Sequence, residues 1–488
     1  MLGKKKFYVT TPIYYPSDKP HLGSAYSTIA GDILARWHEL LGEDVWFLVG
    51  TDDHGQKIWK NARERGKDPK EFVNEMSEKF KEAWKALNIR YRRFIRTTDK
   101  DHEKFVKQFI KKVWENGDIY LGKYEGYYCV DCEAFYTIKD LIEGALCPIH
   151  KRKADFVAED TYFFRLSKYR KKLLEHYKKN PNFIAPSSRK SEMFNRVKEG
   201  LQDLSITRTS FKWGIPFPYK KGHILYVWFD ALPNYISGAG PKQKYWPANV
   251  HLVGKDILWF HTVIWPAMLM SAGYRQPSAV FAHGWLTVRG SKISKSANNS
   301  ADLDLLIELT GADSIRYFLF RQFSFGGDGE FEVNDLINRH NGELVNKLGN
   351  LISRVNGLII KSGQEVSKAE VDEELASKLD LKTIKAHMAK YELDRALSLI
   401  FAHIDECNNY VQSKQPWKLE GEDKNAVLYN VVDSIRRISI LLWPFMPQTC
   451  EKIGDQFGFE APKLDNCKSG LTKSVRVKSA ELLFKKIE

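Results

Sequence analysis

Hydrophobic positions near the start of the chain switch from strand-like to helix-like spacing and back. Phe7–Thr10 is a short β-rich run, and Val45–Val49 is a continuous apolar run of the kind found in strands buried on both faces. Between them, Ser24–Leu41 has apolar residues at helical spacing and ends before Gly42. This order predicts a strand–helix–strand unit. The polar segment Gly50–Gly55 follows its second strand, at the edge where open parallel sheets bind ligands.

The pattern changes twice further along the chain. Residues 118–222 break the α/β rhythm with a cysteine cluster and a basic stretch, which predicts an inserted domain. Strand-like segments return at His223–Phe229 and Val250–Gly254, and a helical segment follows at Ile257–Met270, all within 223–275. The range 336–458 is helical throughout, with few Gly or Pro breakers, as in a helix bundle. The predicted fold class is therefore α/β: a parallel sheet split by an insertion and followed by an α-helical bundle. The predicted domain ranges are 1–117 and 223–275 for the two halves of the α/β domain, 118–222 for the insertion, 276–335 for a connecting region, 336–458 for the bundle and 459–488 for a C-terminal tail.

The composition of the chain indicates the kind of partner it binds and the compartment in which we expect it. The chain of 488 residues carries a formal net charge of +14, which favours a polyanionic partner, although a solvated Lys-rich surface gives the same balance. The sequence shows neither a signal peptide nor an apolar run long enough to span a membrane, so we expect a cytoplasmic location and no membrane partner.

The cysteine cluster has the spacing of a metal site. Cys129 and Cys132 form one C-x₂-C pair, and Cys147 and His150 form a second pair after a gap of fourteen residues. Three thiolates and one imidazole fit a tetrahedral zinc site with no position left for a substrate, so the sequence predicts one structural Zn²⁺. A redox Cys-x-x-Cys motif is the alternative, but it would not need the second pair.

Two short motifs offer groups that bind phosphates. His21-Leu22-Gly23-Ser24 lies where the first strand gives way to a helix, so helix N-terminal amides and an imidazole would face a nucleotide. Lys292-Ile293-Ser294-Lys295-Ser296 lies in a loop rich in Ser and Asn, and its two ammonium groups suit negative charge that develops during a reaction. Taken alone, the first motif is more typical of a helix cap, and the second is more typical of a solvated basic loop.

Two predicted strand ends carry carboxylates. Asp52, Asp53 and His54 follow one of them, and a carboxylate there would pair with the ammonium group of an amino acid. The alternative is a turn in which an aspartate bonds its own backbone. Gly254-Lys255-Asp256 is a similar element at the end of a later strand, suited to hold a ribose through Asp256.

In this order and at this separation, the HLGS and KISKS motifs resemble the two ATP-binding elements of class I aminoacyl-tRNA synthetases, usually written HIGH and KMSKS. The chain resembles the methionyl-tRNA synthetase family in particular, over almost its whole length. The segments that carry this resemblance are Thr10–Tyr15, Gly50–Gly55, Tyr226–Ala231, Gly254–Ile257, Phe260-His261 and Trp265–Met268. The resemblance implies a Rossmann-like sheet split by a zinc-knuckle insertion, a KISKS-loop and stem-contact region at 276–335 and an anticodon-binding bundle at 336–458. Where the family usually has the second histidine of HIGH, this chain has Ser24, which would weaken one ATP contact.

The resemblance also implies roles for individual residues. The implied catalytic residues are His21, Lys292 and Lys295. The implied ATP-binding residues are His21, Gly23, Ser24, Gly254, Asp256, Lys292, Ser294 and Lys295. The implied methionine-binding residues are Ile13, Tyr15, Asp52, Trp228, Ala231, Tyr235, Ile257, Phe260 and His261, and a thioether does pack well against aromatic edges. The implied anticodon-binding residues are Asn346, Asn350, Arg354 and Trp417, whose types suit unpaired bases. Ordinary core is the alternative for Trp228 and Phe260, and a solvated helix face is the alternative for the anticodon residues.

The implied function is that of a methionine–tRNA ligase. L-Methionine and ATP, with Mg²⁺ on the phosphates, would give methionyl-adenylate and pyrophosphate, and methionine would then pass to the 3′-terminal adenosine of tRNA(Met) for initiation and elongation. Isoleucyl-, valyl-, leucyl- and cysteinyl-tRNA synthetases share both ATP motifs, and a non-catalytic tRNA-binding protein that kept the fold is an alternative of another class. Many family members continue past the bundle into an oligonucleotide-binding appendix, and we expect a form of the enzyme without it. We expect either a monomer or a separate tRNA-binding subunit that joins through the basic stretch Leu471–Glu488.

Overall fold

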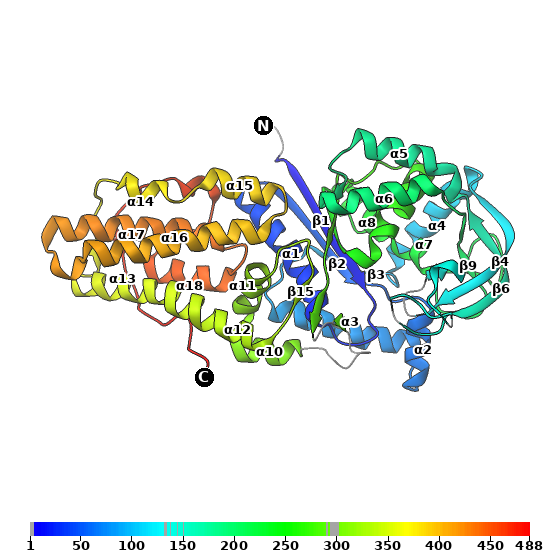
Figure 1. Cartoon of the computed structure of the whole chain (residues 1–488), viewed down its shortest axis with the longest axis horizontal. Coiled ribbons are helices and arrows are strands. Elements are labelled where there is room, and N and C mark those ends of the chain that lie inside the picture. The colour runs from blue at the N-terminus through cyan, green and yellow to red at the C-terminus, as the bar shows by residue number, and fades with distance from the viewer. Residues whose placement is uncertain are drawn as a thin grey trace.

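The computed structural model describes residues 4–130, 134–136, 138–143, 145–149, 151–288, 291–292 and 302–488. Its parts lie in a row along the longest axis of the molecule (Figure 1). A helical bundle occupies one end, a parallel sheet with its helices lies in the middle, and an antiparallel sheet lies at the other end (Figure 1).

The central sheet has six strands in the order β3-β2-β1-β11-β12-β7, and all of its pairings are parallel. Its strands are β1 (Lys6–Tyr14), β2 (Asp44–Thr51), β3 (Arg93–Arg96), β7 (Ile184–Ala185), β11 (Val250–Gly254) and β12 (Val280–His283). On one side of β1 the strands β2 and β3 follow in chain order, whereas on the other side the order is β11, β12 and β7, although β7 precedes β11 in the chain. The switch point between β1 and β11 is where open parallel sheets form a ligand crevice. The predicted α/β fold class is confirmed.

Both faces of this sheet are covered, which explains the continuous apolar runs. Phe7 and Val9 of β1 pack into a core with α1 (Leu22–Leu40) and α3 (Pro69–Ala86), whereas Tyr8 packs into a second core with α4 (Lys100–Glu115) and α9 (Trp265–Ala272). β1 also runs four residues beyond the predicted Phe7–Thr10, to Tyr14, with an irregular register between Thr10 and Ile13. Strand β1 therefore carries side chains directly to the ligand crevice.

The range predicted as an insertion holds all four strands of the antiparallel sheet. β4 (Ile119–Cys129) and β6 (Asp155–Phe164) form its long central pair, with β5 (Ala134–Tyr136) and β8 (Leu204–Ser205) at its edges. The helices α5 (Arg170–Lys179) and α6 (Ser187–Glu199) follow. Strand β7 lies within 118–222 and yet belongs to the central sheet, where Ala185 pairs with Phe281. A two-residue strand directly before Pro186 leaves no apolar run from which the sequence could predict it.

The return of the α/β pattern after residue 222 also differs from the prediction. β9 (Thr207–Arg208) and β10 (Ile224–Leu225) pair antiparallel outside the central sheet, so the segment expected at 223–229 does not supply a strand of the central sheet. It leads instead into the short helices α7 (Val227–Ala231) and α8 (Asn234–Ser237). The expected helix around 257–270 is a 3₁₀ turn at Lys255–Ile257, a π-helical segment at Phe260–Ile264 and then α9.

The connecting region has a small sheet of β13 (Leu286–Val288), β14 (Ser291–Lys292) and β15 (Gly329–Glu330), and the helices α10 (Leu303–Thr310) and α11 (Ala312–Gln322). The bundle contains α12 (Val333–Arg339), the π-helical segment η7 (His340–Gly349), α13 (Asn350–Lys361), α14 (Glu373–Ser377), α15 (Leu381–Ala389), α16 (Leu393–Lys414), α17 (Gly421–Leu442) and α18 (Pro447–Phe457). The tail packs back on the bundle, since β17 (Val475–Arg476) pairs with β16 (Glu365–Val366) and the carbonyls of Lys485 and Ile487 accept hydrogen bonds from His340 and Asn341. Within the described ranges, no helix has the length and apolar character that a membrane span requires.

Candidate active site

A single cavity of about 1020 Å³ opens at the carboxyl ends of the central strands. Tyr14 ends β1, Asp52 follows β2, Gly254 ends β11 and His283 ends β12, and all four residues line this cavity. Parallel strands bring their carboxyl ends to the same edge of a sheet, so residues separated by more than two hundred positions meet here. The cavity therefore occupies the crevice that the strand order predicts.

His21 is the N-cap of α1 and is fixed by hydrogen bonds on both sides. Its Nδ1 accepts from the amide of Gly23 at 3.0 Å, and its own amide donates to Ser24 Oγ at 3.0 Å, a reciprocal capping box. Because Nδ1 is an acceptor, this contact assigns the proton of the neutral ring to Nε2, the nitrogen that would donate to a phosphate oxygen. A Cβ at Gly23 would lie 2.9 Å from Cε1 of His21, so glycine leaves room for the imidazole.

The structure gives Ser24 a role that the sequence did not predict. Its hydroxyl accepts from the amide of His21 and donates to the carbonyl of His21 at 2.7 Å, so it caps the helix. Ser24 also lines the cavity, as do His21 and Gly23. The departure from the usual HIGH motif therefore leaves the geometry of the helix N-terminus intact.

A second group of candidate nucleotide contacts lies across the cavity at the end of β11. Gly254 and Asp256 both line the cavity, and a Cβ at Gly254 would lie 2.5 Å from Oδ1 of Asp256. The indole Nε1 of Trp285 donates to the same Oδ1 at 3.2 Å, and Lys255 lies 4.2 Å from the centre of the Trp285 ring. Trp285 lines the cavity but was missing from the predicted site, although it directly follows the strand-like segment that ends at His283.

The KISKS motif falls only partly within the described residues. β14 contains Lys292 and pairs with β13 at Thr287, next to Leu286 of the cavity wall. This pairing brings the backbone of Lys292 close to the cavity. The predicted residues Ser294 and Lys295 lie outside the described residues.

All nine residues predicted to bind methionine line the same cavity. Trp228 of α7 stacks on Phe260 with ring centroids 3.9 Å apart and an angle of 8° between the planes. Both side chains are only partly buried and border the cavity, which a pair belonging wholly to the core would not do. The rings form an aromatic wall of the kind that favours a thioether.

His261 forms the base of this pocket as a neutral imidazole. Its Nδ1 donates to the carbonyl of Ile257 at 3.0 Å, and its Nε2 accepts from the hydroxyl of Tyr235 at 2.7 Å. Burial lowers the pKa of His261 to about 4, and burial also raises the pKa of Tyr235, so both groups are uncharged at neutral pH. An uncharged and internally hydrogen-bonded base suits an apolar side chain.

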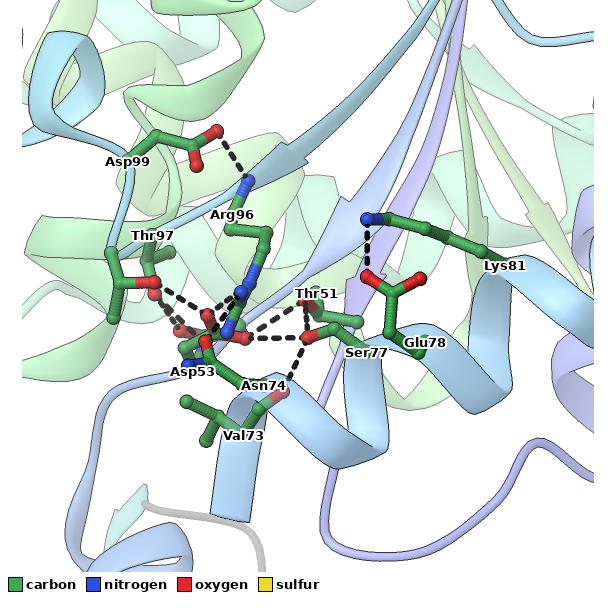
Figure 2. A network of polar contacts seen from close by, with 12 residues as sticks. Thr51, Asp53, Val73, Asn74, Ser77, Glu78, Lys81, Arg96, Thr97 and Asp99 are labelled. Atoms are coloured by element: carbon green, nitrogen blue, oxygen red, sulfur yellow. Dashed lines mark hydrogen bonds and ion pairs between the residues drawn. The ribbon is translucent and has the colours of Figure 1, made fainter. Parts of the chain in front are cut away.

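Asp52 is placed by a polar network centred on its neighbour Asp53, which Figure 2 shows. The carboxylate of Asp53 is fully buried and accepts from Arg96 at 2.7 Å and from Thr98 at 2.7 Å. Burial raises the pKa of Asp53, and Arg96 offsets that effect only in part. Asp52 itself is 5% exposed, lines the cavity and accepts from Thr97 Oγ1 at 3.3 Å. The network of Asp53 therefore holds the loop in which Asp52 presents its carboxylate to the cavity.

Lys19 is a second cavity residue that the sequence did not predict. Its Nζ lies 2.7 Å from Asp302 and 2.9 Å from Asp304, at the N-terminus of α10. These contacts raise the pKa of Lys19, chiefly through the hydrogen bond to Asp302. The segment before His21 is thus tied to the helix that follows the KISKS motif. Its position two residues before His21 was the only available signal.

The cysteine cluster is described only in part. Cys129 ends β4 and is 2% exposed, and Cys147 is fully buried. The amide of Cys147 donates to the carbonyl of Arg152 and its carbonyl accepts from the amide of Lys151, which closes a tight turn. Cys132 and His150 lie outside the described residues, and among the residues that are described no group of three or more His, Cys, Asp and Glu could hold a metal ion.

The predicted anticodon residues gather on the outside of the bundle. Asn346 and Asn350 are exposed on η7 and at the start of α13. The guanidinium of Arg354 lies 4.6 Å from the centre of the Trp417 ring and donates to Gln412 of α16 at 2.9 Å. Trp417 is 42% exposed, so its ring has an accessible surface. The structure brings Arg354 and Trp417 together although 63 residues separate them.

Comparisons with known proteins agree with this geometry. The family model described as "tRNA synthetases class I (M)" matches residues 7–155 and 138–356, and the model "Anticodon-binding domain of tRNA ligase" matches residues 375–477. A methionine–tRNA ligase of Caldanaerobacter subterraneus is 47% identical over 99% of this chain and 79% of its own length. A methionine–tRNA ligase of Thermotoga maritima is 45% identical over 99% of this chain and 80% of its own length.

The solved structures extend the likeness to the fold. A structure of Mycobacterium tuberculosis methionyl-tRNA synthetase in complex with methionyl-adenylate superposes with a TM-score of 0.95 at 39% identity, and covers 98% of this chain and 99% of that chain. These similarities decide against the isoleucine, valine, leucine and cysteine families that share the ATP motifs. The chain belongs to the methionyl-tRNA synthetase family of class I aminoacyl-tRNA synthetases.

Proposed function

We propose that the cavity described above activates L-methionine with ATP and then transfers it to tRNA(Met), as a methionine–tRNA ligase. One observation carries the proposal. The predicted methionine residues and the five fully described residues predicted to bind ATP (His21, Gly23, Ser24, Gly254 and Asp256) line one continuous cavity. Its volume of about 1020 Å³ lies near the upper end of the range of roughly 300–1,000 Å³ typical of small-molecule sites, so an amino acid and a nucleotide fit together.

In the first step, a carboxylate oxygen of methionine attacks the α-phosphorus of ATP. The new P–O bond forms as the bond to the β-phosphate breaks, and pyrophosphate leaves. Asp52 binds the ammonium group of methionine, while Trp228, Phe260 and the neutral His261–Tyr235 pair enclose its thioether. His21 Nε2–H and the amides at the start of α1 stabilise the phosphates, together with Lys292 and Lys295.

Mg²⁺ bound to the phosphates would supply further charge neutralisation. Asp256 at the end of β11 is the residue assigned to the ribose. No protein nucleophile is required, because the adenylate itself is the activated intermediate. Catalysis then rests on positioning and on electrostatic stabilisation of the transferring group.

In the second step, the 3′-terminal adenosine of the tRNA attacks the methionyl carbonyl and AMP leaves. α2 (Gln56–Glu64), the residue after it and the insertion contribute four cations to the cavity lining, Lys57, Arg65, Arg152 and Arg196, and two carboxylates, Glu64 and Asp140. The cations suit the approach of a phosphate backbone. At the far end of the molecule, Asn346, Asn350, Arg354 and Trp417 bind the anticodon, with the indole stacking on a base.

The insertion holds one structural Zn²⁺ through Cys129, Cys132, Cys147 and His150. The tight turn at Cys147 and the burial of Cys129 and Cys147 support this assignment, since structural zinc ligands lie in such turns and are shielded from solvent. The insertion also borders the cavity through Tyr136, Pro148 and Ile149, so the metal would stabilise one wall of the active-site mouth.

A separate tRNA-binding subunit would attach at the C-terminal stretch. The stretch from Leu471 to Glu488, to which we assigned its attachment, already contacts the bundle through β17 and through the carbonyls of Lys485 and Ile487. A partner would therefore bind the outer surface of this stretch. Size-exclusion chromatography with light scattering on protein purified from its native source distinguishes a monomer from a complex.

ATP–pyrophosphate exchange with each amino acid offered singly, in the absence of tRNA, tests the main proposal. We expect exchange that depends on methionine. The absence of exchange with every amino acid, from folded and zinc-loaded protein, would favour the non-catalytic tRNA-binding alternative. Exchange with a different amino acid would overturn the assignment of the pocket.

A further inference from the structure

A buried polar relay lies directly behind the methionine pocket. The carboxylate of Asp230 bridges two imidazoles: Oδ2 lies 2.6 Å from Nδ1 of His54, and Oδ1 lies 3.1 Å from Nε2 of His102. Nδ1 of His102 in turn lies 2.9 Å from the hydroxyl of Ser237. The side chains of Asp230, His54 and His102 are 1%, 6% and 0% exposed. None of the relay residues belongs to the predicted methionine or ATP site.

The relay joins elements that carry different walls of the pocket. His54 lies two residues after Asp52 in the loop that ends β2, and Asp230 lies in α7 between the pocket residues Trp228 and Ala231. Ser237 ends α8, which carries Tyr235. His102 belongs to α4, whose apolar face packs in the core behind the pocket. The relay therefore links the ammonium-binding side of the pocket to its aromatic side.

α7 and the loop after β2 have little regular structure of their own, so side-chain contacts must hold them in place. α7 has only five residues, and its N-cap at Tyr226 makes no side-chain hydrogen bond, so it has little stability of its own. The loop Asp52–Gly55 has no regular structure and is fixed by side chains instead. Trp213 Nε1 donates to the carbonyl of Asp53 at 2.6 Å, and Asp230 holds His54.

The protonation states fit an ionised bridge. Burial alone would raise the pKa of Asp230, but His54 and His102 outweigh burial and lower it below its ordinary value. Burial alone would lower the pKa of His54, but Asp230 outweighs burial and raises it. An ionised carboxylate accepts from both imidazole N–H groups at once, which a neutral amide at the same position could not do.

We propose that Asp230, with His54 and His102, is the positioning residue that sets the distance between Asp52 and the aromatic wall of Trp228, and so determines affinity for methionine. This inference rests on the methionine pocket proposed above. ATP contacts on α1 and β11 lie outside the relay, so a defect in it changes methionine binding and leaves ATP binding close to normal.

The test compares steady-state constants and methionine dissociation constants for substitutions in the full chain. Asp230→Asn keeps the shape of the side chain but cannot accept from both imidazoles. We expect KM and Kd for methionine to rise about 10-fold, with KM for ATP changed less than about 2-fold. An unchanged ratio of the two KM values, in folded protein, overturns the proposal even if the variant has lost thermal stability.

Two pairs of variants separate the hydrogen bond from packing. His54→Asn retains an N–H donor near the position of Nδ1, and His102→Gln retains one near the position of Nε2, whereas leucine at either position retains none. We expect the amide variants to keep methionine affinity within about 3-fold and the leucine variants to lose about 10-fold. Equal losses in both members of a pair would show that the donor is irrelevant and would overturn the proposal.

A matched control and a fallback complete the experiment. His387→Leu removes another histidine–carboxylate contact of 2.6 Å, to Glu392 in the bundle, and should leave both KM values unchanged. If Asp230→Asn fails to fold, Ser237→Ala takes its place, because it removes only the hydroxyl that bonds His102. We then expect KM for methionine to rise about 3-fold, and an unchanged KM refutes the relay. Trp228→Ala separates the two proposals: no effect on methionine KM refutes the pocket, whereas an effect there without one in the relay variants refutes only the relay.

Discussion

Replacing Arg316 by methionine is the sharpest test of how the bundle and the catalytic sheet depend on one another. The side chain is fully buried and donates to four acceptors: Asp32 Oδ2 at 2.7 Å, the carbonyls of Pro444 at 2.7 Å and Phe445 at 2.9 Å, and that of Leu87 at 3.2 Å. These acceptors belong to α1, to the connection between α17 and α18, and to the end of α3. One guanidinium thus joins three separate segments.

The cost of the substitution follows from what it leaves behind. Methionine preserves most of the apolar stem, but three buried carbonyls lose a donor, and of the two arginines that pair with Asp32 among the described residues Arg36 remains. Breaking a buried charge pair on one side costs about 3–5 kcal/mol, which is a large part of the roughly 5–15 kcal/mol that stabilises a typical domain. We therefore expect Arg316→Met to lose about 3–5 kcal/mol of unfolding free energy.

The same substitution should change the response to acid. Burial would raise the pKa of Asp32, but Arg36 and Arg316 outweigh burial and lower it. A carboxylate with a lowered folded pKa stabilises the protein above its unfolded pKa, and that stability is lost as pH falls through the folded value. Without Arg316 the folded pKa rises, so acid unfolding should begin at a higher pH than in the wild type.

Urea titration followed by circular dichroism and by tryptophan fluorescence measures both effects. Arg395→Met is the matched control, because Arg395 is 63% exposed and pairs with Glu392, the N-cap residue of the same helix. We expect a loss below about 0.5 kcal/mol in that variant. A loss for Arg316→Met that is no larger than for the control would refute the argument that this contact couples the segments.

Three further predictions concern the functional regions. Trp417→Ala should raise KM for tRNA about 10- to 100-fold by removing one stacking surface, while tRNA-independent pyrophosphate exchange stays at the wild-type rate. His261 has a folded pKa of about 4 against an ordinary value of 6.5, so the stability that its neutral form contributes is fully present above pH 6.5. About 3 kcal/mol of unfolding free energy should be lost as pH falls towards 4. Urea titrations at pH 7 and pH 4.5 should show this loss in the wild type and not in His261→Gln. Removing zinc with a chelator should release one Zn²⁺ per chain, which a colorimetric dye measures, and should make residues 118–222 more susceptible to proteolysis. Cys147→Ser should release less Zn²⁺ than the wild type.

Pattern and motif together predicted the residues at the ends of the central strands and at the start of α1 that line the cavity, because a simple rule links them. Carboxyl ends of parallel strands share one edge, so polar residues after the apolar runs at Val45–Val49 and Val250–Gly254 had to meet. His21 needed only a strand before it and a helix after it. The structure confirms the α/β fold and places these residues around one cavity, whereas the proposed roles of individual residues await the experiments above.

The features that the sequence did not predict are those without a local signal. β7 has two residues and no apolar run, and its place in the sheet follows only from its pairing with β12. His54 and Asp230 are 176 positions apart, and Asp230 and His102 are 128 positions apart, so nothing near any of them marks the relay. A buried polar contact between distant segments depends on the complete fold and cannot be inferred from spacing.

The helical bundle does not line the cavity, but Arg316 connects it to α1, whose N-terminus does. α1 has 19 residues and begins at the candidate ATP motif, and Asp32 lies about 16 Å along its axis from His21. Most residues of α1 are buried and its backbone is hydrogen-bonded along its length, so we expect a shift of the α17–α18 connection against Asp32 to be transmitted along the helix to His21. Displacements of about 1 Å in a reacting group can cost a factor of about 100 in rate. The hydrogen bonds of Arg316 therefore connect the bundle, which carries Trp417 on its outer surface, to the helix whose N-terminus lies at the phosphate end of the cavity.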